Sequence, residues 1–368
     1  MKLNRVIISG GGTGGHIFPA IAIADEIKRR NPQAEILFVG AKGKMEMEKV
    51  PAAGYRIEGL TIAGLQRKLT LSNFLLPFKL LSSMMKARSI VKGFKPQVVI
   101  GVGGYASGPT LKAATLLGIP ALIQEQNSFP GKTNKLLAKD VKAICTAYEG
   151  LERFFPKEKI ILTGNPVRIE MVRTEGKKEE ALSYYGFDPS KKTLLIIGGS
   201  LGARTLNESV VAAYDELKES GIQVLWQCGK LYHEGLKERL SGREAANIKL
   251  TMFIDRMDLA YAVADVIISR AGAISVSELC IIGKPVILVP SPNVAEDHQT
   301  KNAMALVDKG AAILVRDKEA ISELIPKALE LLDNSEVAQG LAVEVRKLGR
   351  PDATAHIVDA IEKIAREE

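Results

Sequence analysis

The chain has 368 residues, of which 46% are hydrophobic and 25% are charged. This composition excludes a disordered chain, and the length suggests two domains, each large enough for its own core. The formal net charge of +8 favours anionic partners, namely phosphates, nucleic acid or an anionic membrane surface.

The chain opens with a strand expected at 5–9, which ends in five glycines within the six positions from Gly10 to Gly15. His16 follows, and a helical pattern of apolar residues begins at Ile17. Glycines let backbone N–H groups approach a ligand closely, and the helix N-terminus behind them favours negative charge. A histidine at the mouth of such a turn suggests chemistry as well as binding. The alternative is a tight connection with an ordinary helix-capping residue.

Further strands alternate with helical patterns along the whole chain. They are expected at 35–39, 97–101, 119–123, 142–146 and 159–162, and then at 193–197, 222–226, 248–252, 265–268, 285–289 and 312–315. This alternation predicts an α/β protein with parallel sheets and right-handed crossovers.

The stretch from Thr163 to Pro166 breaks this pattern and predicts a joint between two domains, 1–164 and 165–350. Two similar Rossmann-like halves imply parallel sheets facing across a deep cleft, with ligands at the carboxyl ends of the strands. We expect a last helix near 351–366, within the C-terminal segment 351–368, to pack back on the first domain.

Two more glycine-rich turns follow predicted strands, at Gly101–Pro109 and at Gly198–Arg204. Together with the first turn they suggest two ligands that carry diphosphates. Glycine is also common in βα turns that bind nothing, so this alternative stays open.

From Gly59 to Gln124 the sequence contains no Asp or Glu, whereas it contains eight Lys and Arg residues interleaved with Leu, Phe and Met. A basic, apolar surface segment suits peripheral contact with an anionic membrane. The alternative is a helix with one face in the core and a solvated basic face.

Polar clusters follow three other predicted strands. Gln124–Asn127 contains Glu125, a candidate base or electrostatic stabiliser. In Arg270–Glu278, the hydroxyls of Ser275 and Ser277 near a helix start suit an anion, and Glu278 suits a ribose diol unless it only compensates the helix dipole. Asp297–Gln299 either faces the same cleft or caps the next helix.

Several chemistries are disfavoured by what the sequence lacks. The three cysteines share no CxxC spacing, and no Asp-x-Asp or metal-ligand set occurs. No ribose acid follows the first glycine turn, which disfavours a nicotinamide oxidoreductase. We expect no cofactor, no signal peptide and no membrane span, and phosphate charge handled by backbone N–H groups, helix ends, and Arg168 or Arg204.

Eight motifs in order resemble the MurG family, bacterial transferases that convert lipid I to lipid II in peptidoglycan synthesis with UDP-N-acetylglucosamine. The matching segments are GGGTGGHIFPA at 10–20, GVGGYASGP at 101–109, EQN at 125–127, GNPVR at 164–168, GGSLGAR at 198–204, FID at 253–255, SRAGAISVSE at 269–278 and DHQTKNA at 297–303. The resemblance implies a GT-B fold and a metal-independent, inverting transfer of N-acetylglucosamine at the cytoplasmic face of the cell membrane. It implies lipid I and the anionic inner leaflet as partners, and no nucleic acid.

The resemblance also implies roles for individual residues. Those expected to bind the donor are Thr13, Gly14, Gly15, Asn127, Arg168, Ser200, the backbone at Ile254, Ala273, Ile274, Ser275, Val276, Ser277, Glu278 and Gln299. Those expected near the acceptor, as candidate catalytic residues, are His16, Tyr105 and Glu125.

One departure from the family matters, because Gln124 stands where a histidine usually precedes the EQN motif. The proposed base is therefore His16 or Glu125, and we prefer His16, since a free histidine has a pKa near 6.5. Two other functions stay open: a GT-B transferase acting on another lipid, such as diacylglycerol, and a non-catalytic module that binds nucleotide sugar or anionic lipid.

Overall fold

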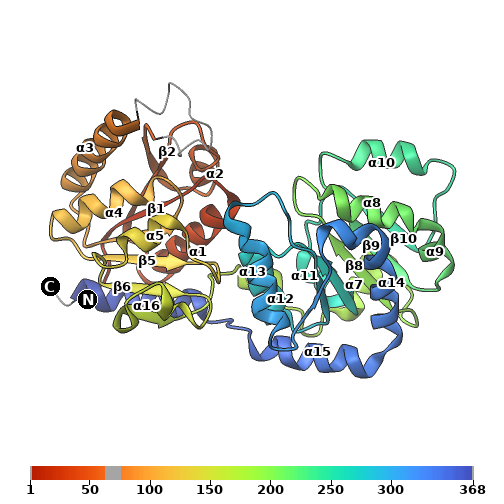
Figure 1. The fold of residues 1–368 in the computed structure, drawn as a ribbon. Helices are drawn as coiled ribbons and strands as arrows, with labels where there is room; N and C mark the ends of the chain where they lie inside the picture. The colour runs from red at the N-terminus through yellow and green to blue at the C-terminus, as the bar shows by residue number, and fades with distance from the viewer. Residues whose placement is uncertain (1, 63–75, 367–368) are drawn as a thin grey trace. The chain divides into compact units, whose positions relative to one another are not determined.

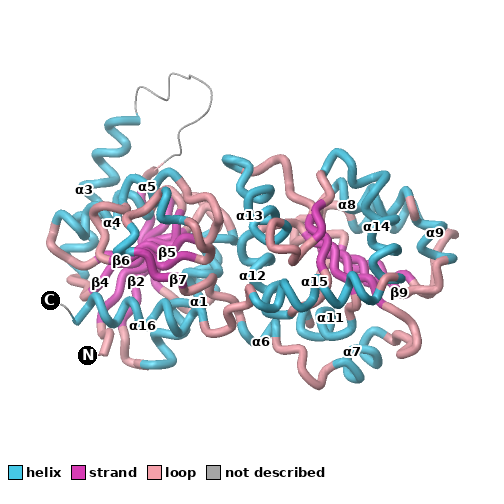
Figure 2. Tube along the Cα trace, turned by 60° about the horizontal axis from the view of Figure 1, so that its bottom comes forward, coloured by secondary structure: helices cyan, strands magenta, loops and turns pink. Residues whose placement is uncertain are grey.

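A computed structural model describes residues 2–62 and 76–366 of the chain. The chain divides into two compact units, Met1–Val167 with Pro351–Glu368, and Arg168–Arg350. In each unit, helices cover both faces of a central sheet (Figures 1 and 2).

The sheet of the first unit has seven strands among the described residues, in the order β3-β2-β1-β4-β5-β6-β7, and all its neighbours pair in parallel. Its strands are β1 (Arg5–Gly10), β2 (Glu35–Ala41), β3 (Arg56–Leu60), β4 (Val98–Gly103), β5 (Ala121–Glu125), β6 (Ala143–Thr146) and β7 (Ile160–Leu162). The central strands are continuous apolar runs because both of their faces are buried. The order reverses between β1 and β4, which makes their carboxyl ends the switch point of this sheet.

The helices of the first unit lie in two layers. They are α1 (Gly14–Arg30), α2 (Glu46–Ala52), α3 (Leu76–Phe94), α4 (Ser107–Leu116), α5 (Lys132–Leu137) and α16 (Ala353–Arg366), with the 3-10 turns η2 (Leu151–Arg153) and η3 (Lys157–Lys159). One core joins α1 and α16 to one face of the sheet. A second core joins α3, α4 and α5 to the opposite face.

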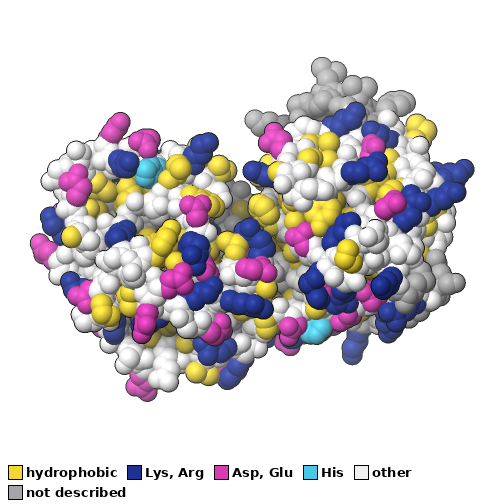
Figure 3. Space-filling model, turned by 180° about the vertical axis from the view of Figure 1, so that it is seen from behind, with side chains coloured by type: hydrophobic (Ala, Val, Ile, Leu, Met, Phe, Trp, Pro, Cys, Tyr) yellow, Lys and Arg dark blue, Asp and Glu magenta, His cyan; other side chains and the backbone are white. Residues whose placement is uncertain are grey.

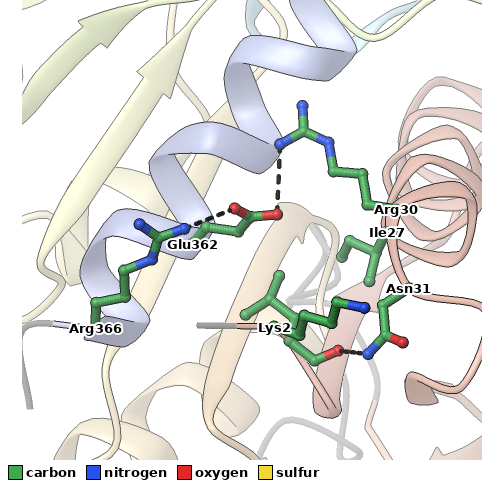
Figure 4. Close-up of a pocket in the computed structure, with 7 residues that line it drawn as sticks. Lys2, Ile27, Arg30, Asn31, Glu362 and Arg366 are labelled. Atoms are coloured by element: carbon green, nitrogen blue, oxygen red, sulfur yellow. Dashed lines mark hydrogen bonds and ion pairs between the residues drawn. The ribbon is translucent and has the colours of Figure 1, made fainter.

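Helix α16 comes from the far end of the chain and is fastened to α1. Ile357 and Ile361 are fully buried in the core that also contains Ile23 of α1. Arg30 of α1 donates to Asp359 at 2.6 Å and to the carbonyl of Ala355 at 2.9 Å. Figure 4 shows a pocket at this junction, beside which Glu362 accepts from Arg30 and Arg366, and Asn31 donates to the carbonyl of Leu3.

The second unit repeats the design with six parallel strands in its described residues, in the order β10-β9-β8-β11-β12-β13. Its strands are β8 (Thr193–Ile197), β9 (Gln223–Gln227), β10 (Ile248–Thr251), β11 (Val266–Ser269), β12 (Val286–Leu288) and β13 (Ile313–Leu314). Its helices are α6 (Ile169–Val172), α7 (Lys178–Tyr185), α8 (Arg204–Ala212), α9 (Tyr214–Glu219), α10 (His233–Leu240), α11 (Met257–Val263), α12 (Ala273–Ile282), α13 (His298–Val307), α14 (Ala320–Asp333) and α15 (Ser335–Lys347), with η4 (Ala295–Asp297) and η5 (Asp317–Glu319). The switch point of this sheet lies between β8 and β11.

The structure confirms two Rossmann-like parallel sheets and every strand that the sequence predicted, with ends shifted by a few residues. It adds β3, an edge strand whose sequence, RIEGL, contains too few apolar residues to mark it. The first helix begins at Gly14, so Gly14, Gly15 and His16 occupy its first turn and lie beyond the glycine turn itself.

Candidate active site

The two glycine turns of the first unit meet at its switch point. Gly103 and Gly104 both have positive φ, at 101° and 88°. A Cβ atom on Gly104 would collide with the backbone of Gly11, and one on Gly103 would lie 2.7 Å from the ring of His16. Glycine is therefore required here both for backbone conformation and for close approach.

His16 is half-buried in the first turn of α1, with Nδ1 2.9 Å from the carbonyl oxygen of Gly11. Because a carbonyl oxygen only accepts hydrogen bonds, the neutral ring carries its proton on Nδ1. Nε2 is then the basic nitrogen, and it lies on the side of the ring that faces Gly103. This tautomer is the one that a base acting through Nε2 requires.

Glu46, at the start of α2, is a buried carboxylate beneath the first glycine turn. It accepts hydrogen bonds from the N–H groups of Gly12, at 2.8 Å, and Ala41, at 2.9 Å, and it packs against Gly11. A negative charge therefore already organises this turn, which makes it less suited to a diphosphate. Sequence reasoning missed Glu46, because acidic residues are ordinary in a first helical turn.

Glu125 ends β5 and is buried. Its Oε1 accepts from the backbone N–H of Asn127 at 3.0 Å and from the Asn127 side chain at 3.3 Å. Its Oε2 accepts from the N–H of Gly131 at 3.1 Å and from Asn134 Nδ2 at 2.8 Å. A carboxylate with four such partners shapes the turn that carries Asn127, and this geometry favours a positioning role over proton transfer.

Tyr105 lies in the turn between β4 and α4, with 52% of its surface exposed. Its ring is thus available to a ligand at the switch point of the first sheet.

Gln124 is fully buried in a polar cluster. It donates to Asn165 Oδ1 at 3.0 Å and accepts from the side chain of Gln126, while Asn165 donates to the carbonyl of Gln126 at 3.0 Å. The side chain that replaces the family's usual histidine is therefore committed to internal hydrogen bonds.

In the second unit, the turn after β8 carries the exposed residue Ser200. The turn is closed by a hydrogen bond from the N–H of Gly202 to the carbonyl of Gly199 at 2.9 Å. It lies against the end of β9, because a Cβ atom on Gly202 would collide with the carbonyl of Cys228. Since β8 and β11 are neighbours, this turn and the start of α12 leave adjacent strands at the same edge.

Helix α12 begins at Ala273, after Gly272, so Ala273, Ile274 and Ser275 form its first turn. Val276 is buried, so its side chain faces the interior. The hydroxyl of Ser277 donates to the carbonyl of Ala273 at 3.0 Å, within its own helix.

Glu278 lies on α12 near Tyr261 of α11, whose hydroxyl donates to Glu278 Oε2 at 3.3 Å. Burial raises the pKa of Glu278 to about 7, against the opposing effects of the Arg168 charge and the Tyr261 hydrogen bond. The Arg168 guanidinium therefore lies close enough to interact electrostatically with Glu278, which brings together two residues that the sequence placed at the donor.

The other residues expected at the donor follow more distant strands. Ile254 is buried in the loop after β10, between the exposed Phe253 and α11. Gln299 lies in the first turn of α13, where its Oε1 accepts from the N–H of Ser291 at 2.9 Å. Asp297 is the residue before α13 and accepts from the hydroxyl of Thr300 at 2.7 Å.

The basic, apolar segment is described in part. The portion from 63 to 75, with Arg67 and Lys68, lies outside the described residues, but α3 continues the segment. Leu81, Met85, Arg88 and Lys92 are exposed at helical spacing along α3. Figure 3 shows Lys and Arg side chains spread over the first unit on the face drawn, among exposed hydrophobic side chains.

Among residues 2–62 and 76–366, no group of three or more His, Cys, Asp or Glu side chains is arranged to hold a metal ion. Within the same residues, no helix has the length and apolar character needed to cross a membrane.

Two Rossmann-type sheets with glycine turns at their switch points form the GT-B fold, and comparison with known families gives the class as glycosyltransferase. The glycosyltransferase family 28 N-terminal domain matches residues 6–146, and the corresponding C-terminal domain matches residues 193–357.

Individual relatives narrow the class further. The chain is 57% identical, over its full length and that of the relative, to the UDP-N-acetylglucosamine--N-acetylmuramyl-(pentapeptide) pyrophosphoryl-undecaprenol N-acetylglucosamine transferase of Flavobacterium psychrophilum. It is 58% identical to the protein of the same name from Cytophaga hutchinsonii, over 99% of this chain and 97% of that one. The crystal structure of Acinetobacter baumannii MurG has a TM-score of 0.80 and 33% identity, covering 98% of this chain and 99% of that one. The chain belongs to the MurG family.

Proposed function

We propose that this protein transfers N-acetylglucosamine from UDP-N-acetylglucosamine to the 4-hydroxyl of the muramyl sugar of lipid I, giving lipid II for peptidoglycan synthesis. The observation that carries this proposal is the full-length identity of more than half to relatives named for that reaction. The presence of both family 28 domains in one chain supports it.

The donor binds to the second unit, 168–350. Its diphosphate lies between the turn that carries Ser200 and the start of α12, where helix N–H groups and the Arg168 charge offset the phosphate charge without a protein-bound metal. Glu278 accepts hydrogen bonds from the ribose hydroxyls, the backbone at Ile254 contacts uracil, and Gln299 contacts the sugar. The proximity of Arg168 to Glu278 supports this arrangement.

The acceptor binds to the first unit, near Tyr105 and His16. The 4-hydroxyl oxygen forms a bond to the anomeric carbon as the bond from that carbon to the UDP oxygen breaks, and the anomeric configuration inverts. His16 Nε2 takes the hydroxyl proton, and the leaving electron pair stays on UDP. The hydrogen bond from His16 Nδ1 to Gly11 supports this choice of base, whereas the four hydrogen bonds to Glu125 support a role for that residue in holding Asn127 near the donor sugar.

The protein acts at the cytoplasmic face of the cell membrane as a peripheral enzyme. The exposed stripe of Leu81, Met85, Arg88 and Lys92 on α3 supports this placement, because apolar side chains enter the lipid interface while cations pair with anionic headgroups.

The test is release of UDP from UDP-N-acetylglucosamine with and without a short-chain lipid I analogue. We expect release that depends on the acceptor, with a β-1,4-linked disaccharide lipid as product. Release only with another lipid, such as diacylglycerol, would keep the GT-B chemistry and replace the acceptor. Binding of UDP-N-acetylglucosamine without release, whatever the acceptor, would instead establish a binding module.

A further inference from the structure

Strand β9 carries a buried glutamine at each end. Each glutamine side chain accepts a hydrogen bond from the N–H of one residue in a neighbouring segment and donates one to the carbonyl of the same residue, and we call this pair of hydrogen bonds an amide clasp. At the amino end, Gln223 Oε1 accepts from the N–H of Asp188 at 2.5 Å, and Nε2 donates to the carbonyl of Asp188 at 3.1 Å. At the carboxyl end, Gln227 Oε1 accepts from the N–H of Gly199 at 3.0 Å, and Nε2 donates to the Gly199 carbonyl at 2.9 Å. The contacts are alike, but their places in the fold differ.

The clasp at Gln227 acts on the residue directly before Ser200. Gly199 has a φ of 81°, and the N–H of Gly198 donates to the backbone carbonyl of Gln227 at 3.1 Å. Gln227 therefore holds Gly198 through its backbone and Gly199 through its side chain. An amide that both donates to and accepts from one residue fixes the rotation of that residue's two peptide groups, and thus the direction of the N–H groups that follow.

The same turn is closed from the other side by close packing. A Cβ atom on Gly229 would collide with the N and Cα atoms of Gly202, and one on Gly202 would collide with the carbonyl of Cys228. The turn thus packs against the end of β9 and the residues that follow it, and the side chain of Gln227 adds its hydrogen bonds with Gly199 to these backbone contacts.

The chemical identity of the clasp fits an anionic ligand. The glycine turn of the first unit is organised by a carboxylate, Glu46, which places negative charge beneath it. The turn of the second unit is organised by a neutral amide that makes the same kind of backbone hydrogen bond without that charge. A neutral support leaves the local potential favourable for phosphate.

We propose that Gln227 is a positioning residue for the diphosphate of the donor, which acts through Gly199 and Ser200 and does not itself touch the nucleotide. This inference rests on the proposed function, because it assigns Gln227 to the turn that would hold the donor phosphates.

The test compares Gln227→Leu with Gln223→Leu in the full-length protein. Each variant removes one amide clasp from the same strand, so the two are matched in burial and in hydrogen bonds lost. Binding of UDP and of uridine is measured by calorimetry and by competition, together with the thermal midpoint and the KM values for donor and acceptor.

We expect Gln227→Leu to weaken UDP binding by roughly 10-fold or more, on the scale of the lost hydrogen bonds, to raise the donor KM similarly, and to leave uridine binding and the acceptor KM unchanged. Gln223→Leu should lower the thermal midpoint and leave both ligands unaffected. Should Gln227→Leu fail to fold, the test uses Gln227→Glu, which keeps an acceptor for the Gly199 N–H and adds a negative charge. This variant should weaken the binding of UDP and leave the binding of uridine unchanged.

Equal weakening of UDP and uridine, an equal effect of Gln223→Leu on UDP, or unchanged UDP binding in Gln227→Leu would each overturn the inference. The unmodified protein tests the proposed function separately. If it does not bind UDP, the proposed function is refuted, and with it the role of Gln227.

Discussion

Replacing Gly103 by alanine tests whether His16 acts as the base from its present position, because the added methyl group would displace the imidazole ring. A Cβ atom on Gly103 would lie 2.7 Å from Cδ2 and 2.8 Å from Nε2 of His16, whereas ordinary contact begins at 3.4 Å. The imidazole must therefore move by roughly 0.7 Å, and misplacement on the order of 1 Å costs about 100-fold in rate at a reacting centre.

The expected loss follows from these distances. General bases contribute about 100-fold to 10,000-fold, so displacing His16 should lower kcat by roughly 100-fold or more, which is about 2.7 kcal/mol of activation free energy. The positive φ of Gly103, 101°, adds a backbone strain of about 1–2 kcal/mol to the cost of folding. UDP affinity should change much less than kcat, because the diphosphate and nucleoside contacts proposed above lie on the second unit.

The matched control is Gly118→Ala. Gly118 has a φ of 76°, and no atom lies within 4 Å of the Cβ that alanine would add. The Gly118→Ala variant therefore has the backbone strain of a positive φ but no steric contact with a neighbouring side chain. Both variants should lose thermal stability through backbone strain, but Gly118→Ala should keep its kcat. His16→Ala in the same assay gives the rate expected when the base is absent.

The assay is acceptor-dependent UDP release at saturating donor, with UDP binding measured separately. A folded Gly103→Ala protein with an unchanged kcat would refute the proposed role of His16. A loss of UDP affinity as large as the loss of kcat would instead indicate a general disturbance of the structure.

Three further outcomes are expected. Because burial raises the pKa of Glu278 to about 7, UDP binding should weaken as pH falls from 8 to 6, and Glu278→Gln should remove this dependence. The free energy of unfolding of the protein without ligand should show the opposite trend. Its contribution from protonated Glu278 is lost as pH rises through 7. Tyr261→Phe should move the midpoint of the UDP titration to higher pH, since it removes a hydrogen bond that lowers that pKa; an unmoved midpoint would argue against the contact. Arg30→Ala should lower the free energy of unfolding by about 1–2 kcal/mol, because it removes the hydrogen bonds that join α1 to α16, whereas Arg29→Ala, which removes an exposed pair, should cost at most about 0.5 kcal/mol.

The fold was predictable because its signals are local. Buried parallel strands are short apolar runs, and the glycine turns that end them are visible without any partner. The strand β3 lacked this signal, since an edge strand need not be apolar on both faces.

The supports of the turns were not predictable in the same way. Glu46 and Gln227 matter because of the backbone that they contact, 34 and 28 residues away along the chain. The sequence around Glu46 indicates only the start of a helix, and the sequence around Gln227 indicates only the end of a strand. The committed hydrogen bonds of Glu125 and Gln124 likewise depend on residues brought close by folding, including Asn165, 41 positions from Gln124.

The first unit is built from both ends of the chain, because α16 completes the core around α1. A ribosome releases α1 long before α16, so the first unit cannot finish folding until the second unit has been synthesised. All residues of the second unit, Arg168–Arg350, emerge before α16 does, and domains generally fold as units during synthesis. The apolar surface of the first unit that α16 covers therefore lacks this helix throughout translation of the second unit, and removal of α16 by proteolysis would damage the unit synthesised first.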